Sequence, residues 1–135
     1  MEYTIRQVSE LTGLSASTLR FYEKEQLFPP VKRNEAGVRV YQEQDLERIS
    51  LITCLKNTDM SIRDIKEFVA LSAEGDSTLE SRWKMMRQHK QAVEQRIAEL
   101  QGYLQRINYK VNYYEQACQE GTEARLKKKC QKKAI

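Results

Sequence analysis

The chain of 135 residues is poor in several residue types on which particular classes of protein depend. It has one histidine and five glycines, and it contains neither a Gly-rich phosphate loop nor a pair of carboxylates in a recognisable pocket. The common forms of acid–base and phosphate-transfer catalysis therefore have no candidate residues. No apolar run approaches the roughly 18 residues that a membrane span needs. We expect neither an enzyme nor a membrane protein, and no cofactor.

Cysteine is scarce as well, and its number is odd. Three cysteines exclude a complete disulfide framework. The N-terminal stretch MEYTIRQV lacks the basic and then apolar pattern of a secretory signal, so the default expectation is a cytoplasmic protein, associated with the nucleoid if it binds DNA. In a reducing cytosol the cysteines are thiols, and each needs a structural or chemical explanation.

Positive charge is in excess, but mainly at one end of the chain. The formal net charge is +4, and six lysine and arginine residues lie between Arg125 and Lys133 with no acid among them. Without these six the chain would be mildly acidic. Bulk charge therefore does not locate a nucleic-acid surface, and any such surface must be argued from individual arginines.

Near the N-terminus the sequence predicts two short helices joined by a turn. Residues 5–12 carry apolar side chains at helical spacing, and Gly13 then ends the segment. Ser15 and Ser17 are favourable N-cap residues for a second helix over residues 15–23. Two short helices with glycine between them are typical of a helix-turn-helix, although many bundles contain the same arrangement. The apolar face of the first helix consists of Ile5, Val8 and Leu11.

A β-hairpin is predicted after the second helix. Pro29–Pro30 ends that helix, because proline removes a backbone donor and pushes the preceding residue toward an extended conformation. Residues 34–37 (NEAG) are a turn signal, and the residues after them alternate between apolar and polar up to Tyr41. The pattern predicts a small hairpin, or wing, with Arg33 and Arg39 near its tip.

Two further helices follow the predicted wing. The first, within residues 42–60, is acidic in its first turn, which suits the helix dipole, and it frays at Asn57–Asp59. The second begins after Ser61, from which Asp64 has the spacing of a capping box. Residues 72–78 (SAEGDST) then predict a loop.

From this loop to about residue 118 the sequence predicts one long helix. Apolar residues alternate in steps of four and three along it, and only Lys90 interrupts the apolar series. Heptads sustained over this length indicate a coiled coil, in which a single polar residue can favour a dimer and fix the register. The seam consists of Leu79, Trp83, Met86, Lys90, Val93, Ile97, Leu100, Leu104, Ile107, Val111, Tyr114 and Cys118.

The order of these elements resembles the MerR (mercury-resistance regulator) family of bacterial transcription regulators. The residues that carry the resemblance are YTIRQVSELTGLSASTLRFYEKEQLFPPVKRNEAGVRVYQEQDLERISLI and, after it, MSIRDIKEF. Gln42 lies where the family often has a serine as helix cap. The fold expected is all-α with a small β-hairpin wing: a winged helix-turn-helix domain over residues 1–75, a dimerisation coiled coil over residues 76–118, and a basic, disordered tail over residues 119–135.

The resemblance also implies which residues contact DNA. In the family the helix that corresponds to residues 15–23 enters the major groove, and Arg20 and Tyr22 match its DNA-contacting arginine and tyrosine. An arginine fork suits guanine or phosphate, and the hydroxyl and N–H groups at a helix start suit phosphate. The expected contacts are Ser15, Ser17, Thr18, Arg20, Phe21, Tyr22, the wing residues Arg33, Arg39 and Tyr41, and Lys56 near a second wing.

Some of these side chains have an alternative, purely structural explanation. Leu19 is expected in the core. One of Phe21 and Tyr22 is alternatively a partly buried core residue. Arg39 is alternatively an ordinary exposed hairpin residue. The lysines of the tail are alternatively a solvated terminus and not an additional DNA-binding arm.

The candidate sensor is Cys54. A single cysteine in the third helix, within LITCLKNTDMSIRDI, resembles the branch of the family that responds to aldehydes and thiol stress. Basic groups such as Lys56 could raise its thiolate fraction. The alternative is a buried apolar cysteine packed beside Ile52 and Leu55.

A second reading of the signal uses the other two cysteines. Two thiolates can bind a soft ion, so Cys118 and Cys130 would suit a metal- or redox-responsive regulator, although their spacing does not match the compact loop of the family's metal sensors. Otherwise Cys118 belongs to the coiled-coil seam, and no metal site is expected.

The resemblance implies a homodimer that binds double-stranded operator DNA. It would activate a promoter for RNA polymerase by distorting that DNA in response to a stress signal. An alternative of a different class is a coiled-coil adaptor that does not bind DNA. That alternative explains the heptads, but it explains neither the wing nor the TLRFYE segment.

Overall fold

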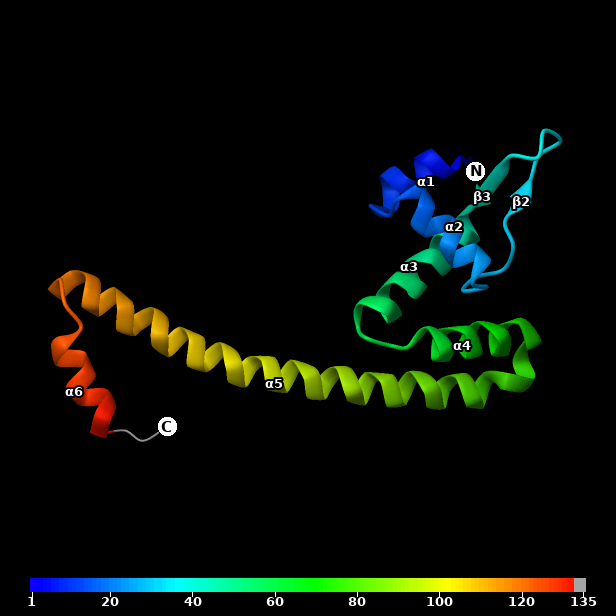
Figure 1. Cartoon of the computed structure of the whole chain (residues 1–135). Helices are drawn as coiled ribbons and strands as arrows, with labels where there is room; N and C mark the ends of the chain where they lie inside the picture. Colours follow the sequence, from blue (N-terminus) through cyan, green and yellow to red (C-terminus); the bar gives the residue numbers. More distant parts are fainter. Residues whose placement is uncertain (133–135) are drawn as a thin grey trace. The chain divides into compact units, whose positions relative to one another are not determined.

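The computed structural model describes residues 1–132, and their side chains up to residue 128, as a mainly helical chain with one small sheet (Figure 1). The expected fold class is thereby confirmed. Residues 1–90 form one compact unit, and the chain from residue 91 on forms a second. The elements of the first unit are β1 (Glu2–Tyr3), α1 (Ile5–Thr12), α2 (Ala16–Lys24), β2 (Lys32–Arg33), β3 (Arg39–Gln42), α3 (Glu43–Asn57), α4 (Ile62–Glu74), the 3₁₀ turn η1 (Asp76–Thr78) and the start of α5 (Leu79–Glu120).

The helix-turn-helix is defined by its caps. The Thr4 hydroxyl accepts a hydrogen bond from the Gln7 N–H, and the Gln7 side chain accepts one from the Thr4 N–H, which completes a capping box at the start of α1. Gly13 follows α1 with a φ of 75°, a left-handed conformation that glycine adopts without strain. Ser15 then caps α2, so the turn between the two helices is short and fixed at both ends.

The sheet has three strands in the order β1–β3–β2, all antiparallel. The predicted hairpin is present as β2 and β3, and β1 pairs with the other side of β3. At the wing tip the Asn34 side chain accepts hydrogen bonds from the Ala36 and Val38 N–H groups, each at 3.0 Å. Gly37, with a φ of 77°, completes this turn.

One apolar core holds the first unit together. Val8, Leu19, Ile49 and Ile65, from four different helices, are fully buried in it. Leu11, which was expected on the same face as Val8, is instead 65% exposed. The reason is that α1 has only eight residues, and its packed face is centred on Val8. The remaining buried residues of this core are Tyr22, Leu27, Phe28, Val31, Tyr41, Ile52 and Leu55.

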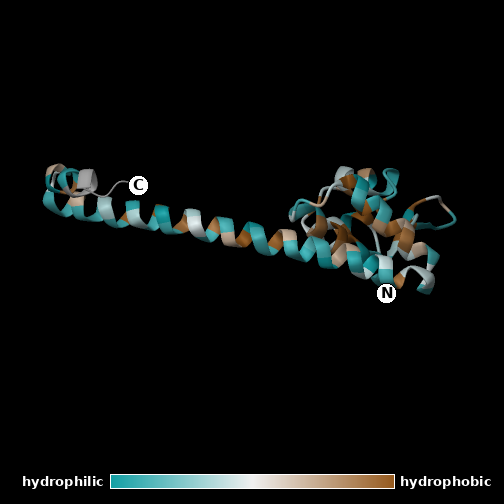
Figure 2. Cartoon of the chain, turned by 90° about the horizontal axis from the view of Figure 1, so that it is seen from below, coloured by the Kyte–Doolittle hydropathy of each residue, from teal (hydrophilic) through white to brown (hydrophobic). Residues whose placement is uncertain are grey.

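Beyond residue 91 the structure consists of the rest of α5 and of α6 (Ala124–Lys132). Of the predicted disordered tail over residues 119–135, residues 119–120 and 124–132 are helical, and residues 133–135 lie outside the described residues. Leu126 is buried with Tyr113 and Ala117 of α5, which gives α6 an apolar anchor. Figure 2 shows apolar residues recurring between hydrophilic ones along α5. Within residues 1–132 no helix has both the length and the apolar character that crossing a membrane requires.

Candidate nucleic-acid interface

The start of α2 presents a group of polar side chains and free backbone donors. The Ser15 hydroxyl accepts a hydrogen bond from the Thr18 N–H at 3.1 Å and lies within 3.0 Å of the hydroxyls of Ser17 and Thr18. Ser15, Ser17 and Arg20 are exposed, and Thr18 is half-buried. The first N–H groups of a helix have no partner within the helix and carry its positive end, so this surface favours a phosphate oxygen.

The aromatic pair of α2 divides between solvent and core. Phe21 is 42% exposed, whereas Tyr22 is 2% exposed and belongs to the core cluster. Tyr22 lies one helical turn after the buried Leu19, so both side chains are on the face that packs inward. The ring of Tyr22 therefore anchors α2, and Phe21 is the aromatic side chain that α2 presents to solvent. That Tyr22 contacts DNA stays a prediction.

The side chain of Lys56 contacts the ring of Tyr22. Its amine lies 5.1 Å from the centre of the Tyr22 ring, in a position for a cation–π contact. Lys56 is exposed on α3, and its charge lies next to α2. The structure thus places Lys56 beside the expected DNA-binding helix through a contact with that helix's buried aromatic side.

The two wing arginines differ in their surroundings. Arg33 is exposed, and its Nη1 donates a hydrogen bond to the Gly37 carbonyl at 2.8 Å, which braces the wing tip. Arg39 is half-buried, and its Nε lies 3.2 Å from a carboxylate oxygen of Glu23 on α2. The side chains of this ion pair are only 23% and 16% exposed. Arg39 therefore ties the wing to α2, and Arg33 is the wing arginine that faces solvent.

Tyr41, expected to contact DNA from the wing, is fully buried. Its hydroxyl has no hydrogen-bond partner among the described residues. Burial raises the pKa of the Tyr41 phenol above its ordinary value, and the carboxylate of Glu23 raises that pKa further. The alternation of β3 turns Tyr41 to the face opposite that of its half-buried neighbours Val40 and Gln42, so Tyr41 belongs to the core. That it contacts DNA stays a prediction.

Cys54, the candidate sensor, is exposed on α3. The alternative of a buried cysteine packed beside Ile52 and Leu55 is therefore wrong, although both of those neighbours are buried. The Cys54 carbonyl accepts a hydrogen bond from the Thr58 hydroxyl at 2.8 Å. That hydroxyl also lies 2.7 Å from Nε2 of His89 on α5.

Of the other two cysteines, the structure describes only the side chain of Cys118. Cys118 is exposed, and the side chain of Cys130 lies outside the described residues. Within the part of the chain that the structure describes, no group of three or more His, Cys, Asp or Glu side chains is placed to hold a metal ion.

Sequence reasoning misses two contacts of this region. Glu23 is the partner of an arginine 16 positions further along the chain, and Thr58 meets His89 across 31 positions. No local pattern reveals such pairs. The only available signal was that His89 is the single histidine of the chain.

Comparison with known proteins identifies the same elements. A model of the MerR HTH family of regulatory proteins matches residues 3–71, and a second model, described as MerR, DNA binding, matches residues 46–108. The chain is 44% identical over 117 residues to an uncharacterized HTH-type transcriptional regulator of Haemophilus influenzae, which covers 87% of both chains. It is 42% identical over 87 residues to the HTH-type transcriptional regulator AdhR of Bacillus subtilis, which covers 64% of this chain and 62% of AdhR.

A solved structure extends the likeness to three dimensions. HiNmlR, described as a MerR family regulator lacking the sensor domain and bound to promoter DNA, superimposes with a TM-score of 0.85 and 43% identity. The match covers 91% of this chain and 98% of HiNmlR. These relatives are transcription regulators, and this chain is likewise a regulator and not an enzyme. It belongs to the MerR family of helix-turn-helix regulatory proteins.

Proposed function

We propose that the protein is a homodimeric transcription activator that binds operator DNA through α2 and the wing and responds to an electrophile at Cys54. The observation that carries the DNA-binding part is the set of exposed polar groups at the start of α2, on a helix whose other face is fixed in the core by Leu19 and Tyr22. The promoter DNA bound to HiNmlR supports the same assignment.

The proposed contacts follow the exposure of the side chains. Ser15, Ser17 and the adjacent N–H groups of α2 bind phosphate, while Arg20 reaches a base edge or phosphate in the major groove. Thr18 supports the capping of α2, and Phe21 adds an apolar contact. Outside α2, Arg33 and Lys56 bind backbone phosphates, and Arg39 keeps the wing in position for them.

The homodimer is proposed from the apolar seam of α5. Ile97, Leu100, Leu104 and Ile107 are each between 50% and 58% exposed in the single chain. Apolar side chains in such a continuous row indicate an interaction surface, and their heptad spacing suits a second helix of the same kind. The antiparallel orientation of the two helices is taken from the family resemblance.

A two-fold dimer recognises a pseudo-palindromic operator, because operator symmetry mirrors protein symmetry. By family resemblance we place this operator between the −35 and −10 promoter elements, where distortion of the DNA brings both elements into register for RNA polymerase. This activity places the protein with the chromosome, in the cytoplasm. A DNase footprint on the region upstream of its own gene should cover the spacer between the two elements. Protection wholly upstream of the −35 element would contradict the mechanism.

For the signal, we assign the reactive thiol to Cys54. The thiol is exposed and therefore accessible to an electrophile. The turn after Cys54 is connected to α5 through the Thr58 hydroxyl, which contacts both the Cys54 carbonyl and His89. An adduct at Cys54 would alter this end of α3, and the Thr58–His89 contact would carry the displacement to α5.

The sensor assignment is tested by cysteine substitutions. Cys54→Ser should keep operator affinity but lose induction of the promoter by formaldehyde, whereas Cys118→Ser and Cys130→Ser should behave as the wild type. Induction that persists in Cys54→Ser would reject the assignment. Loss of induction only in the Cys118→Ser, Cys130→Ser double variant would instead support the metal- or redox-responsive alternative.

A further inference from the structure

A partly buried arginine near the start of α5 has no carboxylate partner. The Arg82 side chain donates from Nη2 to the Gly75 carbonyl at 2.9 Å and from Nε to the Thr78 hydroxyl at 3.0 Å. Among the described residues no carboxylate lies within 4.0 Å of it. A guanidinium has five N–H groups, so Arg82 is held in place with donors to spare. Partly buried charges are usually paired, and this one lacks a counterion among the residues that the structure describes.

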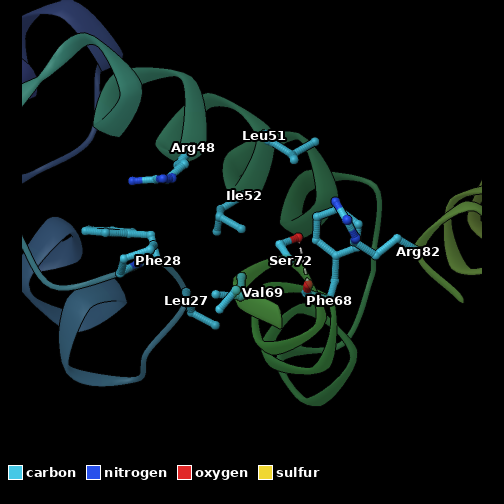
Figure 3. Close-up of a pocket in the computed structure, with 11 residues that line it drawn as sticks. Leu27, Phe28, Arg48, Leu51, Ile52, Phe68, Val69, Ser72 and Arg82 are labelled. Atoms are coloured by element: carbon cyan, nitrogen blue, oxygen red, sulfur yellow. Dashed lines mark hydrogen bonds between the residues drawn. The ribbon is translucent and has the colours of Figure 1, made fainter. Parts of the chain in front are cut away.

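Arg82 lines a cavity of about 350 Å³ within the first unit. The loop after α2, α3 and α4 form its walls, and most of the lining side chains are apolar, among them Leu27, Phe28, Leu51, Ile52, Phe68 and Val69. In Figure 3, Arg48 and Arg82 are drawn at opposite sides of the cavity, with Ile52, Val69 and Ser72 between them. The volume is at the lower end of the range for small-molecule sites.

The charged side chains that line the cavity are all positive. Its polar side chains are Arg48, Ser72 and Arg82, and no aspartate or glutamate lines it. Arg48 has only a long contact to Asp45, at 3.7 Å, and remains exposed. An apolar cavity with cationic groups at its edges is complementary to a molecule that joins an anionic head to a hydrocarbon body.

We propose that this cavity binds a small amphipathic carboxylate, with the carboxylate on Arg82 and the hydrocarbon part against Ile52, Phe68 and Val69. A guanidinium fork matches the planar geometry of a carboxylate, and its fixed orientation lowers the entropy lost on binding. The predominance of apolar walls disfavours a fully hydrated inorganic anion. The proposed DNA contacts and Cys54 lie outside this cavity, so the site is independent of the proposed function.

Isothermal titration of the full-length protein with sodium octanoate tests the proposal. We expect one octanoate per chain, with no measurable binding of acetate, which lacks the hydrocarbon part, and much weaker binding of 1-octanol, which lacks the charge. Arg82→Gln should weaken octanoate binding about tenfold or more, as expected for a lost charged hydrogen bond. The control Arg87→Gln removes an arginine of α5 that lies over Trp83 and outside the cavity, and it should leave binding unchanged.

A second pair of variants does not depend on the contacts of Arg82 with Gly75 and Thr78. Ala73→Phe places a ring at the cavity and should abolish octanoate binding, whereas Ala70→Phe, on the exposed surface of the same helix, should not. Equal binding of octanoate and 1-octanol, or full affinity in Arg82→Gln and Ala73→Phe, would overturn the proposal. Absence of octanoate binding to the wild type would overturn it as well.

Discussion

The two units of the chain use apolar residues at helical spacing in opposite ways. In residues 1–90 such residues meet one another, and Leu19, Ile49 and Ile65 are fully buried. Along α5 beyond residue 91 the same kind of spacing leaves Leu104 and Ile107 more than half exposed. The periodicity alone therefore predicts an apolar face, but it does not tell whether the partner of that face lies in the same chain.

The difference is informative about function. A unit that completes its own core is able to present a fixed surface to another molecule, as α2 presents Ser15, Ser17 and Arg20. A helix with an uncovered apolar row is incomplete until another surface covers it. We therefore assign DNA reading to the first unit and association of two chains to α5, and the following substitutions are designed to separate these two roles.

The largest effect is expected in the seam. Ile97→Asp combined with Leu104→Asp would bury two unpaired carboxylates from each chain in the dimer, at a cost of several kcal/mol, and should convert it to monomers in light scattering. The control is Gln95→Asp combined with Arg106→Asp, because the 100° spacing of a helix places these residues on the face opposite the seam. The control should remain dimeric. An intact dimer in the seam variant would contradict the role of α5.

The next effect concerns the DNA-reading surface. Arg20→Ala should weaken operator binding by roughly 1–3 kcal/mol if Arg20 contacts a base, as measured by gel shift at fixed salt. Arg106→Ala removes an exposed arginine of α5 that is not among the proposed DNA contacts, and it should have little effect.

Tyr22→Phe tests whether a buried residue of α2 contributes to operator binding. Because the Tyr22 ring is buried, removing its hydroxyl should lower operator affinity much less than Arg20→Ala does. A loss as large as that of Arg20→Ala would show that Tyr22 reads DNA directly.

A smaller effect is expected for the ion pair that joins the wing to α2. Glu23→Gln leaves Arg39 partly buried without its carboxylate and should lower the free energy of unfolding by about 1 kcal/mol. Glu10→Gln is the matched control, since Glu10 pairs with Arg6 in an ion pair whose side chains are 69% and 89% exposed. Exposed pairs contribute little, so the control should be near neutral in urea unfolding.

The smallest effect at neutral pH is expected for Tyr41→Phe. The Tyr41 hydroxyl has no hydrogen-bond partner among the described residues, so its removal should leave stability nearly unchanged or slightly raised. At alkaline pH the two proteins should diverge. Because the folded protein raises the pKa of Tyr41 above the ordinary 10.0, ionisation favours unfolding, and wild-type stability should fall more steeply than that of Tyr41→Phe above this pH. Parallel pH profiles in urea unfolding would contradict the burial of Tyr41.

What the sequence could predict was largely local. Gly13 as a helix end, Ser15 and Ser61 as caps, and the turn at residues 34–37 depend on a few neighbouring residues, and all appear in the structure. The heptad seam was similarly visible because its pattern repeats over many turns.

What the sequence could not predict depends on packing between distant segments. Phe21 and Tyr22 are adjacent aromatic residues, and only the position of the core decides which one is buried. The pairing of Arg39 with Glu23 likewise requires β3 to lie against α2. The helix α6 was missed because its lysines suggested disorder, whereas Leu126 finds an apolar partner on α5.

The central claim is that one unit reads DNA and the other joins two chains, and the number of chains on one operator tests it most directly. Native mass spectrometry of the wild type with its operator duplex should give two chains per duplex. The Ile97→Asp, Leu104→Asp variant should give no stable complex with two chains, while Gln95→Asp, Arg106→Asp should match the wild type. A stable wild-type complex with a single chain per operator would contradict the account.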